Sequence, residues 1–150
     1  MSGRRGKVRN AITLFAVVLL YLSDQLTKFL AIKYLSPDES VPVINKILHL
    51  TLVYNTGAAF GMFRSKPHLF VVIAIFAVFF INFLLLRKSH VLNTAEKFSL
   101  CLILAGTLGN LTDRLRFGYV IDFIDLRIWP VFNFADSFIT IGAVILGLSV

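Results

Sequence analysis

Four apolar stretches, each bounded by charged or turn-forming residues, constrain the fold of this chain more than any other feature. They cover about residues 11–31, 69–86, 95–111 and 132–150, and each is near the ~20 residues that cross roughly 30 Å of hydrocarbon as a helix. Only 15% of the residues are charged and 57% are hydrophobic, whereas soluble domains carry about 25% charged residues. We predict a single integral membrane domain over residues 1–150, mainly α-helical, with four transmembrane helices.

The basic residues at the ends of these stretches predict the orientation. The first stretch follows a basic head, as in a signal peptide, but it continues past Asp24 to Lys33 without a small-residue cleavage pattern, so we expect a retained span. The N-terminal ten residues and segment 87–97 are denser in Lys and Arg than the longer opposite loops, although the totals are equal. Because cytoplasmic loops are rich in Lys and Arg, we expect both termini in the cytoplasm and residues 33–66 and 112–131 outside.

The outward segments have the composition of strands rather than of linkers. Val41–Asn55 is rich in β-branched and aromatic residues and predicts one or two strands at the membrane surface. Gly118–Trp129 predicts an extended segment that Pro130 ends. The small residues over 56–61 predict a tight turn or, as a function, a surface that an extended peptide approaches closely. Gly57 in this run is therefore a candidate substrate-binding residue.

Composition and motifs argue against several other classes of function. The formal charge of +7 is scattered along the chain rather than clustered on one face, so we expect no nucleic-acid partner. Cys101 is the only cysteine and lies in an apolar run, where packing is its expected role. His49, His68 and His90 are dispersed, and the sequence has neither a zinc motif nor a phosphate loop. We expect no metal and no cofactor.

Polar residues within the apolar pattern gather at one depth. An ionisable group inside a bilayer costs about 2.5–3.5 kcal/mol even on the translocon scale, so several at one depth indicate a shared polar site. The residues that map to the outer third of the expected bundle are Asp24, Lys28, Asn55, Asn110, Asp113, Arg114, Asp122, Asn133 and Asp136.

Asp24 and Lys28 have i,i+4 spacing and therefore share a helix face. Such a pair contributes about 0.2–0.5 kcal/mol on an exposed helix, and mutual neutralisation is the favoured interpretation. The catalytic alternative makes Ser23 or Thr27 a nucleophile that Lys28 activates, as in Ser–Lys hydrolases.

Asp122 and Asp136 are a candidate catalytic pair. Asp136 follows Asn133 at the head of the fourth stretch, where an acid beside an Asn N-cap stabilises a helix by about 0.3–1 kcal/mol. Asp122 has apolar neighbours, which favours a buried carboxylate. Two adjacent carboxylates cannot both ionise easily, so the pair can act as base toward a water and as acid toward a peptide carbonyl. Spacing alone does not select these two, because Asp113 and Asp125 are also available.

Five motifs, in order along most of the chain, resemble those of the lipoprotein signal peptidase (signal peptidase II) family. They are D-Q-L-T-K (Asp24–Lys28), N-T-G-A-A-F (Asn55–Phe60), G-N-L-T-D-R (Gly109–Arg114), V-I-D-F (Val120–Phe123) and F-N-F-A-D-S (Phe132–Ser137). The resemblance implies four transmembrane helices with an extracytoplasmic β-cradle, in a bacterial inner membrane. It also implies an aspartic endopeptidase that removes the signal peptide of a prolipoprotein just before its diacylglyceryl-modified cysteine.

On the matching positions, the resemblance makes Asp122 and Asp136 the catalytic dyad. The residues it assigns to substrate binding or dyad support are Asp24, Lys28, Asn55, Asn110, Arg114 and Asn133. The expected partners are diacylglyceryl-modified prolipoproteins, membrane lipid and the cyclic peptide inhibitor globomycin, and we expect a monomer with its site near the outer face. One departure is that the chain stops at Val150 without the usual basic tail.

Two other classes of function remain open. A small transporter or proton-conducting protein would use Asp24, Lys28 and Asp136 as a relay, because intramembrane ionisable residues also mark such pathways. Apart from Glu96 and Lys97 at the inner end of the third stretch, the inner halves of the later spans contain no acidic or basic residue to continue that relay. A non-catalytic membrane scaffold would keep its function when both aspartates are replaced by asparagine.

Overall fold

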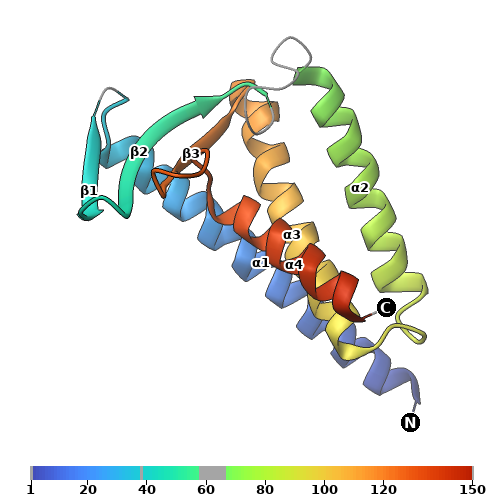
Figure 1. The fold of residues 1–150 in the computed structure, drawn as a ribbon. Helices are drawn as coiled ribbons and strands as arrows, with labels where there is room; N and C mark the ends of the chain where they lie inside the picture. The colour runs from blue at the N-terminus through green and yellow to red at the C-terminus, as the bar shows by residue number, and fades with distance from the viewer. Residues whose placement is uncertain (1, 38, 58–66, 150) are drawn as a thin grey trace.

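The computed structural model describes residues 2–37, 39–57 and 67–149, with four helices and three strands. Helices α1, α3 and α4 lie side by side, α2 runs along α3, and the strands form a small sheet at one end of the helices (Figure 1). The two ends of the chain lie at the opposite end. In chain order the elements are α1 (Ser2–Tyr34), β1 (Ser40–Ile44), β2 (Leu48–Asn55), α2 (Pro67–Arg87), α3 (Thr94–Phe117), β3 (Val120–Asp125) and α4 (Phe134–Ser149).

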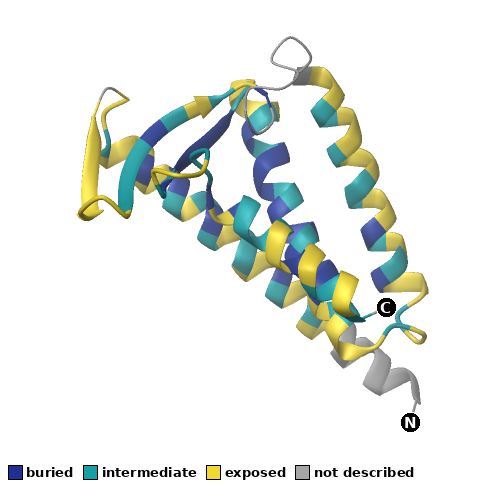
Figure 2. Ribbon diagram, in the orientation of Figure 1, coloured by how far each residue is buried: buried dark blue, intermediate teal, exposed yellow. Residues whose placement is uncertain are grey.

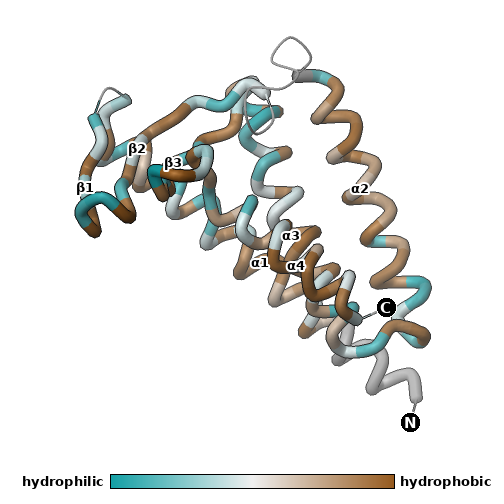
Figure 3. Tube along the Cα trace, viewed as in Figure 1, coloured by the Kyte–Doolittle hydropathy of each residue, from teal (hydrophilic) through white to brown (hydrophobic). Residues whose placement is uncertain are grey.

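The predicted class, mainly helical with a small β portion, is confirmed. Among the described residues, two helices are long and apolar enough to cross a membrane, over Ala11–Tyr34 in α1 and His68–Arg87 in α2. Figure 3 shows the strong apolar character of α2. Helix α4 is apolar but shorter, and it begins at Phe134 rather than at residue 132 because Asn133 caps it. The count of four spans therefore stays a prediction.

The prediction for the third helix, 95–111, ended too early, because α3 continues to Phe117. A capping box starts the helix, in which the Asn93 side chain accepts from the Glu96 N–H and the Glu96 side chain from the Asn93 N–H. Gly118 ends it in the left-handed conformation with φ of 80°. Hydropathy alone misplaced this end because the last turns of α3 carry polar side chains that other elements bury.

The strands form one antiparallel sheet in the order β1-β2-β3. One or two strands were predicted over Val41–Asn55, and the structure has two, β1 and β2. The second prediction, extended structure over residues 118–129, was too long: β3 ends at Asp125, and the backbone turns at Arg127, where φ is 66°. In the β2–β3 register Val53 lies opposite Asp122, so this acid lies in the middle of β3, a strand at the edge of the sheet.

Apolar packing forms two clusters, one between the helices and one beneath the sheet. The first joins α1, α2 and α3 and includes Cys101, which confirms the packing role expected for this residue. The second joins Ala31 of α1 to Leu52, Ile121 and Phe123 of the sheet. Burial is concentrated in β3 and in α3, whereas α2 exposes most of its surface (Figure 2). The polar layer lies between these two clusters.

Candidate active site

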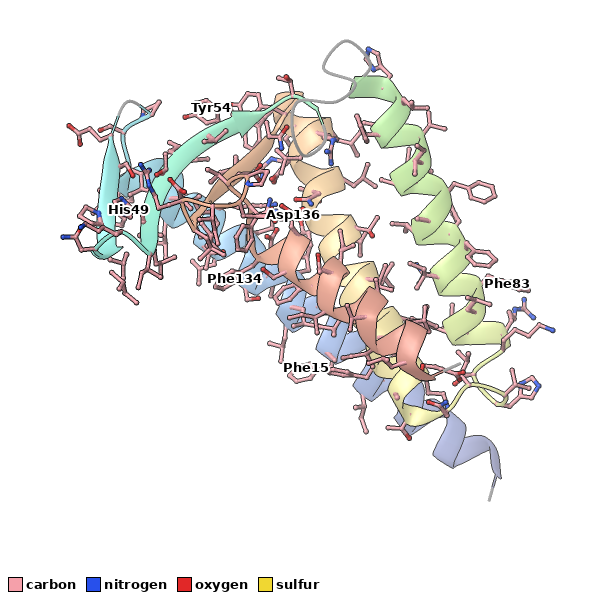
Figure 4. The ribbon with its side chains drawn as sticks, viewed as in Figure 1. Phe15, His49, Tyr54, Phe83, Phe134 and Asp136 are labelled. Atoms are coloured by element: carbon pink, nitrogen blue, oxygen red, sulfur yellow. The ribbon has the colours of Figure 1, made fainter. Side chains whose placement is uncertain are left out.

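A cavity of about 490 Å³ opens where α2, α3, β3 and the start of α4 meet. Both Asp122 and Asp136 line it, and Figure 4 shows Asp136 where α4 begins beside the sheet. Four other residues singled out from the sequence or resemblance lie close by: Asn55, Gly57, Asn110 and Arg114 line the same cavity. Its apolar wall comes largely from α2, through Phe70, Ile73, Ala74 and Ala77.

Asp122 projects from the middle of β3 and is 1% exposed. Asn55 donates to one of its oxygens at 2.9 Å and Asn133 donates to the other at 2.7 Å. Burial raises the pKa of Asp122 to about 7, and the nearby charge of Asp136 pushes the pKa in the same direction. Near neutral pH this carboxyl therefore exists in both its protonated and its charged form.

Asp136 lies in the first turn of α4 and shares a capping arrangement with Asn133. The Asn133 side chain accepts from the Asp136 N–H at 2.8 Å, and the Asp136 carboxylate accepts from the Asn133 N–H at 3.3 Å. This confirms the predicted first-turn acid beside an Asn cap. Asn110 of α3 donates to the other Asp136 oxygen at 2.7 Å, so the carboxylate is held by two donors at the positive end of a helix.

The two acids belong to one hydrogen-bonded group. Asn133 contacts both of them and also donates to the Asn110 oxygen at 3.1 Å. Neither acid forms an ion pair among the described residues. Two carboxyls on one cavity, with one partly protonated at neutral pH, have the properties needed for general acid and general base catalysis.

Asp24 and Lys28 form the predicted pair, with 2.9 Å between the ammonium and the carboxylate. The structure adds Asp113, whose carboxylate lies 2.7 Å from the same ammonium. All three residues are at most 1% exposed. The Asp113 carboxylate also accepts from the Ile121 N–H at 3.2 Å, directly before Asp122 in β3. This ion-paired cluster therefore connects α1 and α3 to the strand that carries Asp122.

The same cluster connects the first helix to the last. Asp24 accepts from the Ala135 N–H at the start of α4, at 2.9 Å. Gln25 donates to Asp24 at 3.2 Å and to Asp113 at 3.1 Å. Gln25 was not among the predicted site residues, and Asp113 was named as part of the polar layer and as an alternative catalytic acid, not as a partner of Lys28. Both lie inside the motifs D-Q-L-T-K and G-N-L-T-D-R, which was the available signal.

The structure does not support the other catalytic alternatives. The Ser23 and Thr27 hydroxyls both donate to backbone carbonyls of α1, while the Lys28 ammonium is engaged by the ion-paired cluster. Asp113 is one of the partners of Lys28. Asp125 accepts from Thr51 and pairs with Arg127 at 3.0 Å.

Asn55, Gly57 and Arg114 meet at the upper rim of the cavity. The Gly57 N–H donates to the Asn55 side-chain oxygen at 3.0 Å, and Arg114 donates to the Gly57 carbonyl at 3.3 Å. The Arg114 guanidinium also lies over the Phe70 ring of α2, 5.3 Å from its centroid. Residues 58–61 of the small-residue run, for which a peptide-approach surface was predicted, lie outside the described residues.

Comparison with known proteins gives one consistent result. A family model described as signal peptidase (SPase) II matches residues 16–150. A lipoprotein signal peptidase of Caldanaerobacter subterraneus is 47% identical over 138 residues, which are 91% of this chain and 92% of that protein. A lipoprotein signal peptidase of Halothermothrix orenii is 45% identical, over 87% of this chain and 88% of that protein.

Solved structures agree with these sequence comparisons. A bacterial membrane enzyme structure is similar with a TM-score of 0.85 and 31% identity, over 92% of this chain and 86% of that chain. A second bacterial membrane enzyme structure has a TM-score of 0.82 at the same identity. With most of the length matched in both sequence and structure, the chain belongs to the signal peptidase II family.

Proposed function

We propose that this protein is a membrane aspartic endopeptidase that removes signal peptides from prolipoproteins, with Asp122 and Asp136 as its catalytic dyad. The observation that carries the dyad is that these two buried or half-buried acids line one cavity, share Asn133 as a hydrogen-bond partner and lack ion pairs among the described residues. The other acids considered, Asp113 and Asp125, are ion-paired.

The unlike surroundings of the two acids support a division of roles. Asp136, at the positive end of α4 with two N–H donors, is the base that takes a proton from water as the water oxygen attacks the scissile carbonyl carbon. Asp122, whose pKa is about 7, is the acid that gives its proton to the carbonyl oxygen. When the C–N bond breaks, Asp136 passes its proton to the leaving nitrogen and Asp122 recovers one from the intermediate.

We further propose the substrate that the family resemblance implies, a prolipoprotein with a diacylglyceryl-modified cysteine, cut just before that cysteine. The names of the relatives and the apolar wall of the cavity both support this substrate. Globomycin would occupy the same cavity, and the active unit would be a monomer. Family membership argues against the transporter alternative, and the ion pairing of Asp24 with Lys28 engages two of the three members of that relay.

The proposed setting is a bacterial inner membrane with four spans, both termini in the cytoplasm and the site near the outer face. Two apolar helices of spanning length and the similarity to bacterial membrane enzymes support a membrane location. The two chain ends lie at the end of the helices opposite the sheet, as an even number of spans requires (Figure 1). The sheet and the cavity would then lie together at the outer surface.

The test replaces each acid singly, as Asp122→Asn and Asp136→Asn, and follows cleavage of a diacylglyceryl-modified prolipoprotein in proteoliposomes. Each variant should lose about 10²–10⁴-fold in rate, the usual contribution of general acid–base groups. Asp125→Asn is the matched control, because it changes an acid of the same strand that pairs with Arg127, and it should cleave at nearly the normal rate. Undiminished cleavage by either dyad variant would contradict the assignment.

A further inference from the structure

Three asparagines from three separate elements surround the two acids in the same way. Each points its side-chain nitrogen at an acid: Asn55 of β2 and Asn133 before α4 donate to Asp122, and Asn110 of α3 donates to Asp136. Each also has its side-chain oxygen held by another group, which is the Gly57 N–H for Asn55, the Asp136 N–H for Asn133, and the Lys28 ammonium together with the Asn133 amide for Asn110.

The chemistry of these outer groups dictates which way each amide faces. An ammonium and a backbone N–H can donate but cannot accept, so the amide atom that faces them must be the oxygen. The nitrogen must then face the acid. The outer donors to Asn55 and Asn133 are main-chain groups, whereas the Asn110 oxygen accepts from two side chains, Lys28 at 2.9 Å and Asn133 at 3.1 Å. The Asn133 amide shares its two N–H groups among three acceptors, so Lys28 is the closer and less divided donor that holds Asn110.

All three N–H groups of the Lys28 ammonium are engaged by acceptors. It carries three N–H groups, and three acceptors surround it: Asp24 at 2.9 Å, Asp113 at 2.7 Å and the Asn110 oxygen at 2.9 Å. The side chain is 2% exposed, so water does not compete for these donors. The two carboxylates therefore hold the ammonium, and the ammonium holds the amide.

We propose that Lys28, which does not contact either acid, is a positioning residue for the dyad: by fixing the Asn110 amide it keeps an N–H donor on the Asp136 carboxylate. This inference rests on the proposed function of Asp136 as the base. Without an obligate donor at position 28, the Asn110 oxygen is held only by the N–H groups that Asn133 shares among three acceptors, so the amide can shift and weaken its N–H bond to Asp136. The base would lose its orientation while the cavity that binds substrate stays intact.

The experiment compares Lys28→Gln with Lys28→Arg in proteoliposomes, measuring kcat and KM for a diacylglyceryl-modified prolipoprotein. Glutamine can still donate to Asp24 and Asp113, but it can also accept, so it no longer dictates the amide orientation. Arginine, like lysine, only donates. We expect Lys28→Gln to lower kcat about ten- to a hundredfold, the effect of one hydrogen bond to a charged group, with little change in KM. Lys28→Arg should restore most of kcat.

A double variant separates positioning from general weakening of the fold. Residues that act through one hydrogen bond give non-additive effects, so Lys28→Gln combined with Asn110→Ala should be no slower than Asn110→Ala alone. Lys33→Gln, the same change at an exposed position of the same helix, is the control and should leave kcat unchanged. Protection of the buried Cys101 from a thiol-reactive dye reports the folded fraction of each variant.

Normal kcat in folded Lys28→Gln, or losses that multiply in the double variant, would overturn the inference. If Lys28→Gln does not fold, Lys28→Arg decides, because a folded arginine variant as slow as Asn110→Ala would equally overturn it. Failure of the proposed function looks different, since Asp122→Asn or Asp136→Asn would then cleave normally whatever residue 28 is.

Discussion

Two groups of buried acids lie a short distance apart in this protein and behave in opposite ways. In one group Asp24 and Asp113 share the Lys28 ammonium and are cut off from solvent. In the other, Asp122 and Asp136 have amide and backbone N–H donors instead of a cation and face a cavity. Asp113 and Asp122 are equally buried, yet they differ in their partners. A cation holds a carboxylate in its charged form, whereas neutral donors allow the carboxyl to gain and lose a proton.

Removing an acid from the ion-paired group should have the largest effect on stability. Asp113→Ala leaves part of the Lys28 charge and the Ile121 N–H without a partner, and breaking a buried ion pair costs about 3–5 kcal/mol. Asp125→Ala is the matched control, because the Arg127 of its ion pair is 49% exposed, and should cost about 1 kcal/mol or less. Thermal unfolding followed by dye labelling of Cys101 measures both. Equal losses would show that the first group is not special.

The two groups of acids are held in place by close contact between α3 and α4, and a substitution at this contact tests its importance. A Cβ at Gly106 would collide with the Ala135 carbonyl and with Ile139. Gly106→Ala should therefore destabilise the protein by about 1–3 kcal/mol through overpacking. At Gly147 of α4 no described heavy atom lies within 4 Å of an added Cβ, so Gly147→Ala should unfold at the normal temperature or slightly above. Similar midpoints for the two variants would contradict this packing account.

A smaller expected effect concerns the pH dependence of the reaction and tests whether Asp122 titrates near neutral pH. A carboxyl is neutral below its pKa, so the acid role of Asp122 should be present below pH about 7 and lost above it, as a fall in kcat/KM. Asn55 donates to Asp122 and so favours the charged form. Asn55→Ala should therefore move the fall to higher pH, by a fraction of a unit to about one unit.

The control for this pH shift is Asn45→Ala, in the exposed turn between β1 and β2, which should leave the profile unchanged. A fall that stays at the wild-type pH in Asn55→Ala, or moves lower, would mean that Asp122 is not the group that titrates.

Much of the fold could be predicted from sequence because apolar length and β-branched composition are local signals. They predicted α2 to within two residues at each end, and they predicted strand structure where β1 and β2 lie. The end of α3 was missed because hydropathy counts Asp113 and Arg114 as exposed. In the structure Asp113 pairs with Lys28, and Arg114 donates to the Gly57 carbonyl. Hydropathy and composition do not show which distant residues will pair with a polar side chain and allow it to be buried.

The candidate site divides in the same way. The motifs pointed to Asp122, Asp136 and their supporting residues, and the structure brings those two acids to one cavity. The role of Asp113 as second partner of Lys28 needed the distance between α1 and α3, since 85 residues separate them along the chain. The orientation of the Asn110 amide likewise follows from which atom of Lys28 it meets, and no residue pattern expresses that.

Helix α2 has one further consequence. Phe70, Ile73, Ala74 and Ala77 turn toward the cavity, while Phe76 and Phe79 on other faces are 75% and 72% exposed. In a bilayer, the helix that forms one wall of the cavity would thus contact lipid on its outer face. A lipid-anchored substrate would then reach the cavity by diffusing within the membrane plane. The quantity that governs its turnover is then the number of substrate molecules per lipid rather than per litre, and diluting the substrate with inert lipid would slow the enzyme even at constant total concentration.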